Sequence, residues 1–556
     1  MKQTLFSSLL ILLFLFGCQS TTNTEEQKSQ ETTSDNGLYD TTSVINKGYK
    51  ILAWNDLGMH CLDKDYSIFS ILPPYNNLVA QVVKTGKEPD LLKKDEIIVT
   101  FQTLNAKNTT SISKTNFWDY VKYLFGVNLP KDEGLKGFNP PQTTAQVMHY
   151  DAKYHYFIAE GIPLTPINDD NSTNHYPLVE VKAKDQYGNV LATTTTVLPV
   201  SDEMDCKKCH ASKSLNNAKP EKGWVNYTNQ EKDYRLNILR LHDEKFPDAV
   251  SEHQDALILR DYNYSKDGLE KTALSGIPIL CAACHQSNAL KTPALVDVKP
   301  LTSAIHLGHK DVMLENNITL SDSTSKSACY SCHPGQSTQC LRGVMGSNNI
   351  ECQNCHGTIQ QVGDIHRMGW LNEPQCDSCH QNRKRYTTVF KNDDIKSGIL
   401  REVLDTTFST NQDIPINNTS LYKMSHGHGK LQCSACHGST HAIYPSSQKE
   451  DNLQSIAFQG YSGTISDCSA CHKTMPKTSH RGPHGMHAVS NWWVDKHGDY
   501  AEDGGYRSCA KCHGSDYKGS SLSKTFTKRN LKIRTYQKDD IVSCYDCHNG
   551  PKGKDD

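Results

Sequence analysis

The pattern of apolar and polar positions changes three times along the chain. Residues 5–16 are almost entirely apolar, whereas residues 19–45 are rich in Ser, Thr, Glu, Gln and Asn. Between residues 46 and 201, short runs of alternating apolar and polar residues are separated by turn residues. After residue 202 no single period is sustained, and we therefore divide the chain into residues 1–18, 19–45, 46–201 and 202–556.

The third segment has the period of two that is typical of half-buried strands. We predict strands over residues 50–54, 78–83, 96–104, 178–184 and 190–198, the last two joined through Gly188 and Asn189 as a hairpin. Residues 117–125 predict a short helix. The segment is therefore predicted to be a β-sandwich-like domain of roughly 150 residues, an ordinary size for one domain.

The last segment predicts a mostly irregular region with short α-helices. Residues 234–242 have the spacing of an amphipathic helix, and residues 411–420 predict a polar loop. Residues 524–535 are basic and favour strands, so we expect a hairpin that packs over the end of the region.

This last segment contains the sequence Cys-x-x-Cys-His nine times. Two thiols at this spacing can add to the two vinyl groups of one haem, and the adjacent histidine can bind its iron. A zinc site or a redox disulfide explains a single Cys-x-x-Cys, but neither requires a histidine directly after the second cysteine nine times. We therefore predict nine covalently bound c-type haems. The cysteine pairs are Cys206 and Cys209, Cys281 and Cys284, Cys329 and Cys332, Cys352 and Cys355, Cys376 and Cys379, Cys433 and Cys436, Cys468 and Cys471, Cys509 and Cys512, and Cys544 and Cys547, followed by His210, His285, His333, His356, His380, His437, His472, His513 and His548.

Apolar residues make up only 36% of the sequence, which is little for a region of this length that must form a core. Sharing residues 206–548 among nine haems leaves roughly 38 residues for each, so the macrocycles are expected to replace much of the side-chain core. We expect that this region does not fold without them.

The ligand on the second side of each iron decides between electron transfer and catalysis at an open site. Sixteen histidines lie outside the motifs, enough to close all nine irons. The candidates are His242, His306, His309, His366, His426, His441, His480, His487 and His497, with His428 and His484 as replacements and Met345, Met368, Met424 and Met486 as the methionine alternative. If histidine closes every iron, the chain passes electrons and does not act on a substrate at iron.

The first segment predicts a secretory signal, with Lys2 before an apolar stretch that is too short to span a bilayer. The sequence before Cys18 resembles a lipobox, which predicts lipidation of Cys18 and a tether over residues 19–45; ordinary cleavage nearby is the alternative. Cys61 and Cys340 remain outside all these sites, either as one disulfide or as two buried thiols.

The formal net charge is −2, so no basic field indicates nucleic acid as a partner. No segment after the signal is long and apolar enough to cross a membrane.

Three motif-bearing stretches, residues 431–441, 482–487 and 508–517, resemble multihaem c-type cytochromes from the envelope and outer surface of metal-reducing bacteria. Residues 51–61 and 66–76 resemble a segment that precedes the haem region in some of them. The resemblance implies an outer-membrane lipoprotein that is secreted across the inner membrane and passes electrons to partner cytochromes or terminal acceptors. It also implies that His441 and one of His484 and His487 are iron ligands.

The same family leaves two alternatives. One is a multihaem reductase with one open-site haem, although the Cys-x-x-Cys-Lys motif that often marks such enzymes is absent from the sequence. The other is a filament-forming subunit, against which the predicted lipid anchor argues. We therefore expect an electron carrier rather than a catalyst.

Overall fold

The computed structural model describes residues 48–551 apart from residues 288, 291, 314–316, 368–373, 375, 381–385, 402–421 and 479–481. The described residues belong to one compact unit, Val44–Asp556. The predicted signal and tether, Cys18, the loop 411–420, Met368 and His480 lie outside the described residues.

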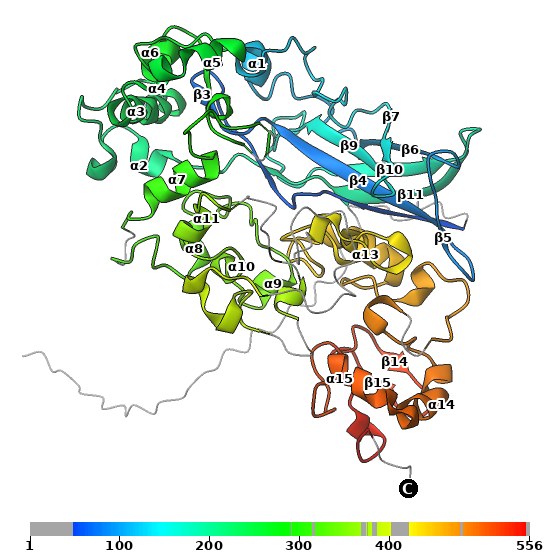
Figure 1. Ribbon diagram of the computed structural model, residues 1–556. Helices are drawn as coiled ribbons and strands as arrows, with labels where there is room; N and C mark the ends of the chain where they lie inside the picture. Colours follow the sequence, from blue (N-terminus) through cyan, green and yellow to red (C-terminus); the bar gives the residue numbers. More distant parts are fainter. Residues whose placement is uncertain are drawn as a thin grey trace, which may run out of the picture. The chain divides into compact units, whose positions relative to one another are not determined.

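The first part of the chain is rich in strands, and the second part consists mostly of short helices (Figure 1). The strands are β1 (Tyr49–Trp54), β2 (His60–Cys61), β3 (Phe69–Ser70), β4 (Tyr75–Lys84), β5 (Asp90–Leu91), β6 (Ile98–Thr103), β7 (Gln146–Val147), β8 (His149–Asp151), β9 (Tyr156–Pro163), β10 (Leu178–Lys184), β11 (Val190–Val197), β12 (Val200–Ser201), β13 (Ile279–Leu280), β14 (Arg529–Asn530) and β15 (Thr535–Tyr536). The α-helices are α1 (Phe117–Phe125), α2 (Lys207–His210), α3 (Gln230–Lys245), α4 (Ala249–Glu252), α5 (Gln254–Leu259), α6 (Leu269–Leu274), α7 (Leu301–His309), α8 (Lys326–Cys329), α9 (Val344–Ser347), α10 (Cys352–His356), α11 (Ile359–Val362), α12 (Cys433–His437), α13 (Lys449–Gln459), α14 (Asn491–Tyr500) and α15 (Tyr506–His513).

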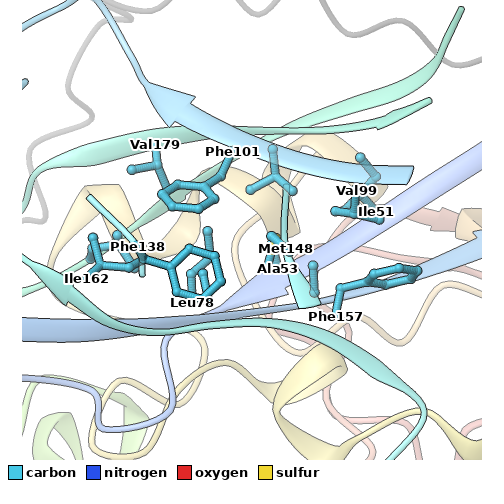
Figure 2. Packing of buried hydrophobic residues seen from close by; sticks show 14 of the residues in the cluster. Ile51, Ala53, Leu78, Val99, Phe101, Phe138, Met148, Phe157, Ile162 and Val179 are labelled. Carbon is cyan, nitrogen blue, oxygen red and sulfur yellow. The ribbon is translucent and has the colours of Figure 1, made fainter. Parts of the chain in front are cut away.

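Two antiparallel sheets form the first part. One has the strand order β1-β4-β9-β8 with β5 on β4, and the other has the order β11-β10-β6-β7. Their inner faces share one hydrophobic cluster, to which Leu78 and Ile162 contribute from the first sheet and Phe101 and Val179 from the second (Figure 2). Antiparallel sheets followed by a mostly irregular region of short helices confirm the predicted fold class at this level.

The strand β10 shows why the sequence pattern was informative. Val179, Val181 and Ala183 are fully buried, and the residues between them are only half-buried. Alternation of this kind places every second side chain on one face of a strand, and this face covers the shared core. The antiparallel pairing of β10 with β11 confirms the predicted hairpin.

The helix α1 has the predicted bounds. Phe117, Val121 and Leu124 are buried on one face, as their spacing of three and four residues requires. The helix ends at Phe125, and Gly126, which follows it, has a φ of 67°, the left-handed conformation that glycine adopts without strain.

In the second part, α3 begins four residues earlier and ends three residues later than predicted. Asn229 caps it, because its side-chain oxygen accepts a hydrogen bond from the Lys232 N–H at 3.1 Å. The residues that the prediction missed, 230–233 and 243–245, are all polar or charged, so an apolar pattern alone underestimated the length of the helix. The predicted basic hairpin is confirmed as β14 and β15, which pair antiparallel.

Contacts cross the boundary that we predicted near residue 201. The strand β3 pairs in parallel with β13, which lies beyond that boundary, whereas β2 pairs with β12 within the first segment. A second hydrophobic cluster joins Phe117 and Trp118 of α1 to Leu236 of α3 and Leu257 of α5. The two-domain division itself stays a prediction, and these contacts join the start of the motif-bearing region to β3 and α1 of the first part.

Candidate functional site

Each cysteine motif lies on a helical turn. In the second motif the His285 N–H donates a hydrogen bond to the Cys281 carbonyl oxygen at 3.0 Å, and the first, third, fifth, seventh and ninth motifs have the same bond at 2.9 to 3.2 Å. Residues three apart on a helical turn lie on the same side of it. Both thiols of a motif therefore point to one side, as attachment of one planar group requires. Nine such Cys-x-x-Cys pairs are compatible with haem attachment.

Seven motif histidines lie opposite a second histidine. The distances between ring centroids are all between 5.9 and 6.3 Å. The pairs, motif histidine first, are His210 with His309, His333 with His306, His356 with His441, His437 with His484, His472 with His428, His513 with His487, and His548 with His497.

This spacing has a direct chemical meaning. An imidazole nitrogen binds a metal ion at about 2 Å, so two imidazoles on opposite sides of one ion have ring centroids roughly 6 Å apart. The pairs therefore have the separation of two axial ligands of one metal. In the second motif, burial and, after it, the charge of His285 lower the pKa of His242, so these two histidines are neighbours.

In eight of these histidines, the ring nitrogen Nδ1 donates a hydrogen bond to a backbone carbonyl oxygen. The distances are 2.7 to 3.3 Å for His285, His306, His309, His472, His487, His497, His513 and His548. A neutral imidazole that donates through Nδ1 carries its lone pair on Nε2. Hydrogen bonding of this kind orients metal-binding histidines in proteins, and it leaves Nε2 as the ligand atom.

Burial keeps several of these histidines neutral. Desolvation, followed by the charge of the paired histidine, lowers the pKa of His333 and His437 to about 4 and that of His356 to about 3. The same causes lower the pKa of His210 and His242 to about 4. A metal binds the neutral imidazole, so the ligand form is the form present at neutral pH.

One helix and one loop supply second histidines to two motifs each. On α7, His306 and His309 lie three residues apart and face the third and first motifs. In residues 482–487, His484 faces the sixth motif and His487 faces the eighth. Each pair of motifs that shares such a segment is therefore held close together.

Electrostatic interactions between cysteines of different motifs, with a hydrogen bond between Cys329 and Cys352, indicate which motifs are neighbours. The neighbouring pairs are Cys281 with Cys206, Cys206 with Cys332, Cys329 with Cys352, Cys355 with Cys379, Cys376 with Cys433, Cys436 with Cys471, and Cys509 with Cys544. The motifs thus follow one another as second, first, third, fourth, fifth, sixth and seventh, with the eighth and ninth as neighbours. The motifs that begin at Cys329, Cys352 and Cys376, which are 23 and 24 residues apart in sequence, are therefore neighbours in space.

His441 is held by a short segment that the sequence did not single out. Its carbonyl oxygen accepts from the N–H groups of Arg342 and Gly343 at 3.0 and 2.7 Å, and its Nδ1 lies 3.6 Å from Cys340 Sγ. The buried Arg342 guanidinium binds both carboxylate oxygens of Asp451, at 2.6 and 2.9 Å, and donates to the Gly58 carbonyl oxygen at 2.7 Å. This arrangement connects the fourth motif's second histidine to the strand-rich part.

The remaining predicted residues are placed as follows. His428, named as a replacement, faces His472, whereas His426 two residues before it forms a backbone bridge with Gln432. His366 is exposed on a turn, and its N–H donates to the Asp364 carboxylate. Histidines two residues apart cannot be told apart from spacing alone, which is why the sequence did not decide between His426 and His428.

Cys61 and Cys340 are both thiols in the described structure. Burial, with a smaller contribution from the charge of Cys340, raises the pKa of the Cys61 thiol, and burial raises the pKa of Cys340 to about 11. The two cysteines are therefore near one another although 278 residues separate them in sequence. Their bonding as a disulfide stays a prediction.

No family model, curated protein or solved structure matches this chain. Among the described residues, no helix has the length and apolar character needed to cross a membrane. No group of three or more His, Cys, Asp or Glu side chains in the described ranges is arranged to hold a metal ion.

Proposed function

We propose that this chain binds nine c-type haems covalently and transfers electrons between them outside the cytoplasm. The observation that carries the proposal is the set of seven histidine pairs with ring centroids 5.9 to 6.3 Å apart, each including the histidine of a Cys-x-x-Cys-His motif. Thiols that can form the thioether bonds and two facing imidazoles are the donor set of a six-coordinate haem c.

The proposed second ligands of the first four motifs are, in order, His309, His242, His306 and His441. For the fifth motif the second ligand is one of the sequence candidates His366, His426 and His480. The second ligands of the sixth to ninth motifs are, in order, His484, His428, His487 and His497. The Nδ1 hydrogen bonds and the neutral state of the buried histidines support this assignment.

A bound haem supplies an iron that takes up and returns one electron. The paired histidines would hold each iron and leave no position on it for a substrate, and the protein keeps successive motifs close together. The contact between Cys329 and Cys352 and the shared helix α7 support short steps between neighbouring haems. Similar ligands on all irons favour overlapping potentials, which stepwise transfer along a row of haems needs.

We further propose that the chain is a member of the multihaem c-type cytochromes and is anchored in the cell envelope as an outer-membrane lipoprotein through Cys18. The signal-like residues 1–18 and the polar residues 19–45 support this location. The two sheets that enclose a common core support a β-sandwich-like first domain. The proposed partners are other cytochromes or terminal electron acceptors.

Mass spectrometry and carbon monoxide binding test the proposal. The mature chain is expected to carry nine haem additions, and the reduced wild-type protein is expected to bind no carbon monoxide. His497→Gly is expected to open one iron in nine and to bind one equivalent, because glycine offers no ligand atom.

His253→Gly is the matched control, since His253 lies at the start of α5 and is outside the proposed ligand set. It is expected to bind no carbon monoxide. Fewer than nine additions contradict the haem content, and carbon monoxide binding by the wild type contradicts closure of every iron and favours a reductase with an open site.

A further inference from the structure

A strongly basic hairpin follows the eighth motif. Residues 518–538 contain seven Lys or Arg residues and no Asp or Glu, in a chain whose net charge is −2. The strands β14 and β15 pair within this segment, and Lys532 and Ile533 lie in the turn between them. The proposed electron-transfer function does not explain this concentration of positive charge.

The hairpin lies directly on the ninth motif. The Arg534 guanidinium is 3.1 Å from the carboxylate of Asp546, which stands between Cys544 and Cys547. The Tyr536 hydroxyl donates to the same carboxylate at 3.2 Å. The basic segment is therefore fixed beside the attachment site of the last haem.

Four of the basic side chains have acidic neighbours, and those contacts are mostly at the surface. The Lys532–Asp495 pair is 2.9 Å long, and both side chains are about half exposed. Ion pairs of this kind contribute roughly 0 to 1 kcal/mol, so carboxylates of another protein can compete for the lysine. Lys528 and Lys538 are exposed as well.

Two exposed apolar side chains lie beside basic groups: Ile533 stands between Lys532 and Arg534 in sequence, and the Lys518 ammonium is 6.0 Å from the centre of the Tyr545 ring. Ile533 is 58% exposed at the tip of the hairpin, and Tyr545 is 50% exposed inside the ninth motif. A few apolar contacts within a charged rim are typical of the small interfaces through which redox proteins meet transiently. Charge complementarity then favours a partner with carboxylates around its own redox centre.

We propose that this hairpin is the docking site of an acidic one-electron redox protein, which exchanges electrons with the chain through the ninth motif. This inference rests on the proposed function. One electron passes between the partner's reduced centre and the ferric iron at the ninth motif, or in the opposite direction. No bond is formed or broken and no proton is needed for balance.

Electron exchange with an acidic probe tests the docking site. Reduced plant-type [2Fe–2S] ferredoxin is mixed with the oxidised holoprotein in a stopped-flow instrument at several salt concentrations. The double variant Lys528→Glu with Lys538→Glu is expected to lower the rate constant at low salt by about tenfold or more, and to flatten its salt dependence, because electrostatic steering accelerates such encounters by roughly 10 to 1,000-fold. With a basic cytochrome c as the probe, the same variant is expected to raise the rate.

Lys136→Glu with Lys266→Glu is the matched control, because it makes the same change in net charge at exposed lysines outside the hairpin. It is expected to change the rate less than twofold. Equal slowing by both double variants, or none by the hairpin variant, overturns the proposal. Loss of a dimer on the hairpin substitution, seen by analytical ultracentrifugation, identifies a second copy as the occupant and also overturns it.

Titration with dithionite separates this proposal from the one on which it rests. Dithionite is a small reductant that requires no docked protein, and each variant is expected to take up nine electrons per chain. If nine electrons are taken up but the hairpin substitutions leave the rate constant with ferredoxin unchanged, only the docking proposal is wrong. If the wild type takes up none, the proposed function itself is wrong.

Discussion

The two parts of this molecule fill their interiors in different ways. The cluster between the two sheets contains Leu78, Phe101, Phe157, Ile162 and other large apolar side chains. After residue 300, in contrast, the buried apolar residues of the described chain are ten, and six of these are alanine: Ala328, Ala435, Ala442, Ala470, Ala488 and Ala510. Small side chains cannot fill a core of that extent, so the second part needs another source of apolar volume.

Three of these alanines, Ala435, Ala470 and Ala510, lie between the two cysteines of a motif. A small residue at that position lets the helical turn approach a flat group closely. The sheets therefore have a core of their own side chains, whereas under our proposal the motif region is built around the haems attached to it. The predictions below test this difference, starting with the largest effect.

Preventing haem attachment is expected to unfold the motif region selectively. In a chain made without the haem attachment machinery, residues beyond 300 should lose protease resistance, because their buried surface is mostly that of the missing groups. The strands of residues 49–201 should retain it, since their core needs no cofactor. Limited proteolysis with mass spectrometry of the fragments measures both. A haem-free chain that is protected throughout residues 300–551 would show that the comparison is wrong.

Leu78→Ala tests the self-sufficiency of the sheet core. Leu78 is fully buried between the sheets, so the substitution is expected to lower the free energy of unfolding of this part by about 2 to 5 kcal/mol. Urea unfolding followed by pulse proteolysis measures the change. Ile98→Ala in the second sheet is the control, because Ile98 is 40% exposed and should lose less than about 1 kcal/mol.

The same variant separates the two parts. The haem absorbance of Leu78→Ala should be that of the wild type in native buffer, because the substitution lies outside the motifs. A changed spectrum would mean that the sheet core determines haem ligation, which our division of the molecule does not allow.

A buried histidine gives the sheet-bearing part its own pH dependence. Burial lowers the pKa of His60 to about 4, and its Nε2 donates to the Pro73 carbonyl oxygen at 3.1 Å. The unfolded chain binds a proton at an ordinary pKa near 6.5, so the stability due to neutral His60 is complete above that pH. It is lost as the pH falls toward 4, by about 3 kcal/mol.

His60→Gln should remove that dependence, because the glutamine amide can still donate to Pro73 but does not titrate. Urea midpoints measured between pH 4 and pH 7 are expected to vary less in the variant than in the wild type. An unchanged pH profile would assign the acid sensitivity to other groups.

The sequence predicted the sheets well because their pattern is local. The hairpin of β10 and β11 and the bounds of α1 follow from alternation and helical spacing within a few residues. The pairing of β3 with β13 could not be predicted, since each strand has two residues and their partners are more than 200 residues apart. Helices such as α13 carry buried polar residues, including Asp451 and Asn452, and therefore lack an apolar stripe.

The candidate site also has features that local sequence predicts and features that depend on distant contacts. All nine Cys-x-x-Cys-His motifs follow from spacing alone, because their chemistry is contained in five consecutive residues. The second histidines depend on how distant segments fold together. His441, for example, faces His356 from 85 residues away and is held there by Arg342 and Cys340, which no local pattern connects to it.

The smallest expected effect is that of a helix cap in the motif-bearing part. Asn229→Ala removes the acceptor for the Lys232 N–H at the start of α3 and should cost about 1 kcal/mol. The first-turn amides should then exchange with deuterium roughly fivefold faster. His242 lies more than three turns further along the same helix, where the proposed iron ligation opposite His285 fixes it. Its haem should therefore keep its absorbance and potential, and Thr228→Ala, one residue before the cap, should change neither quantity. If fraying at Asn229 shifts that potential, then helix α3, rather than the attached group, sets the geometry of the second motif. The difference between the sheets and the motif-bearing part is then smaller than we infer.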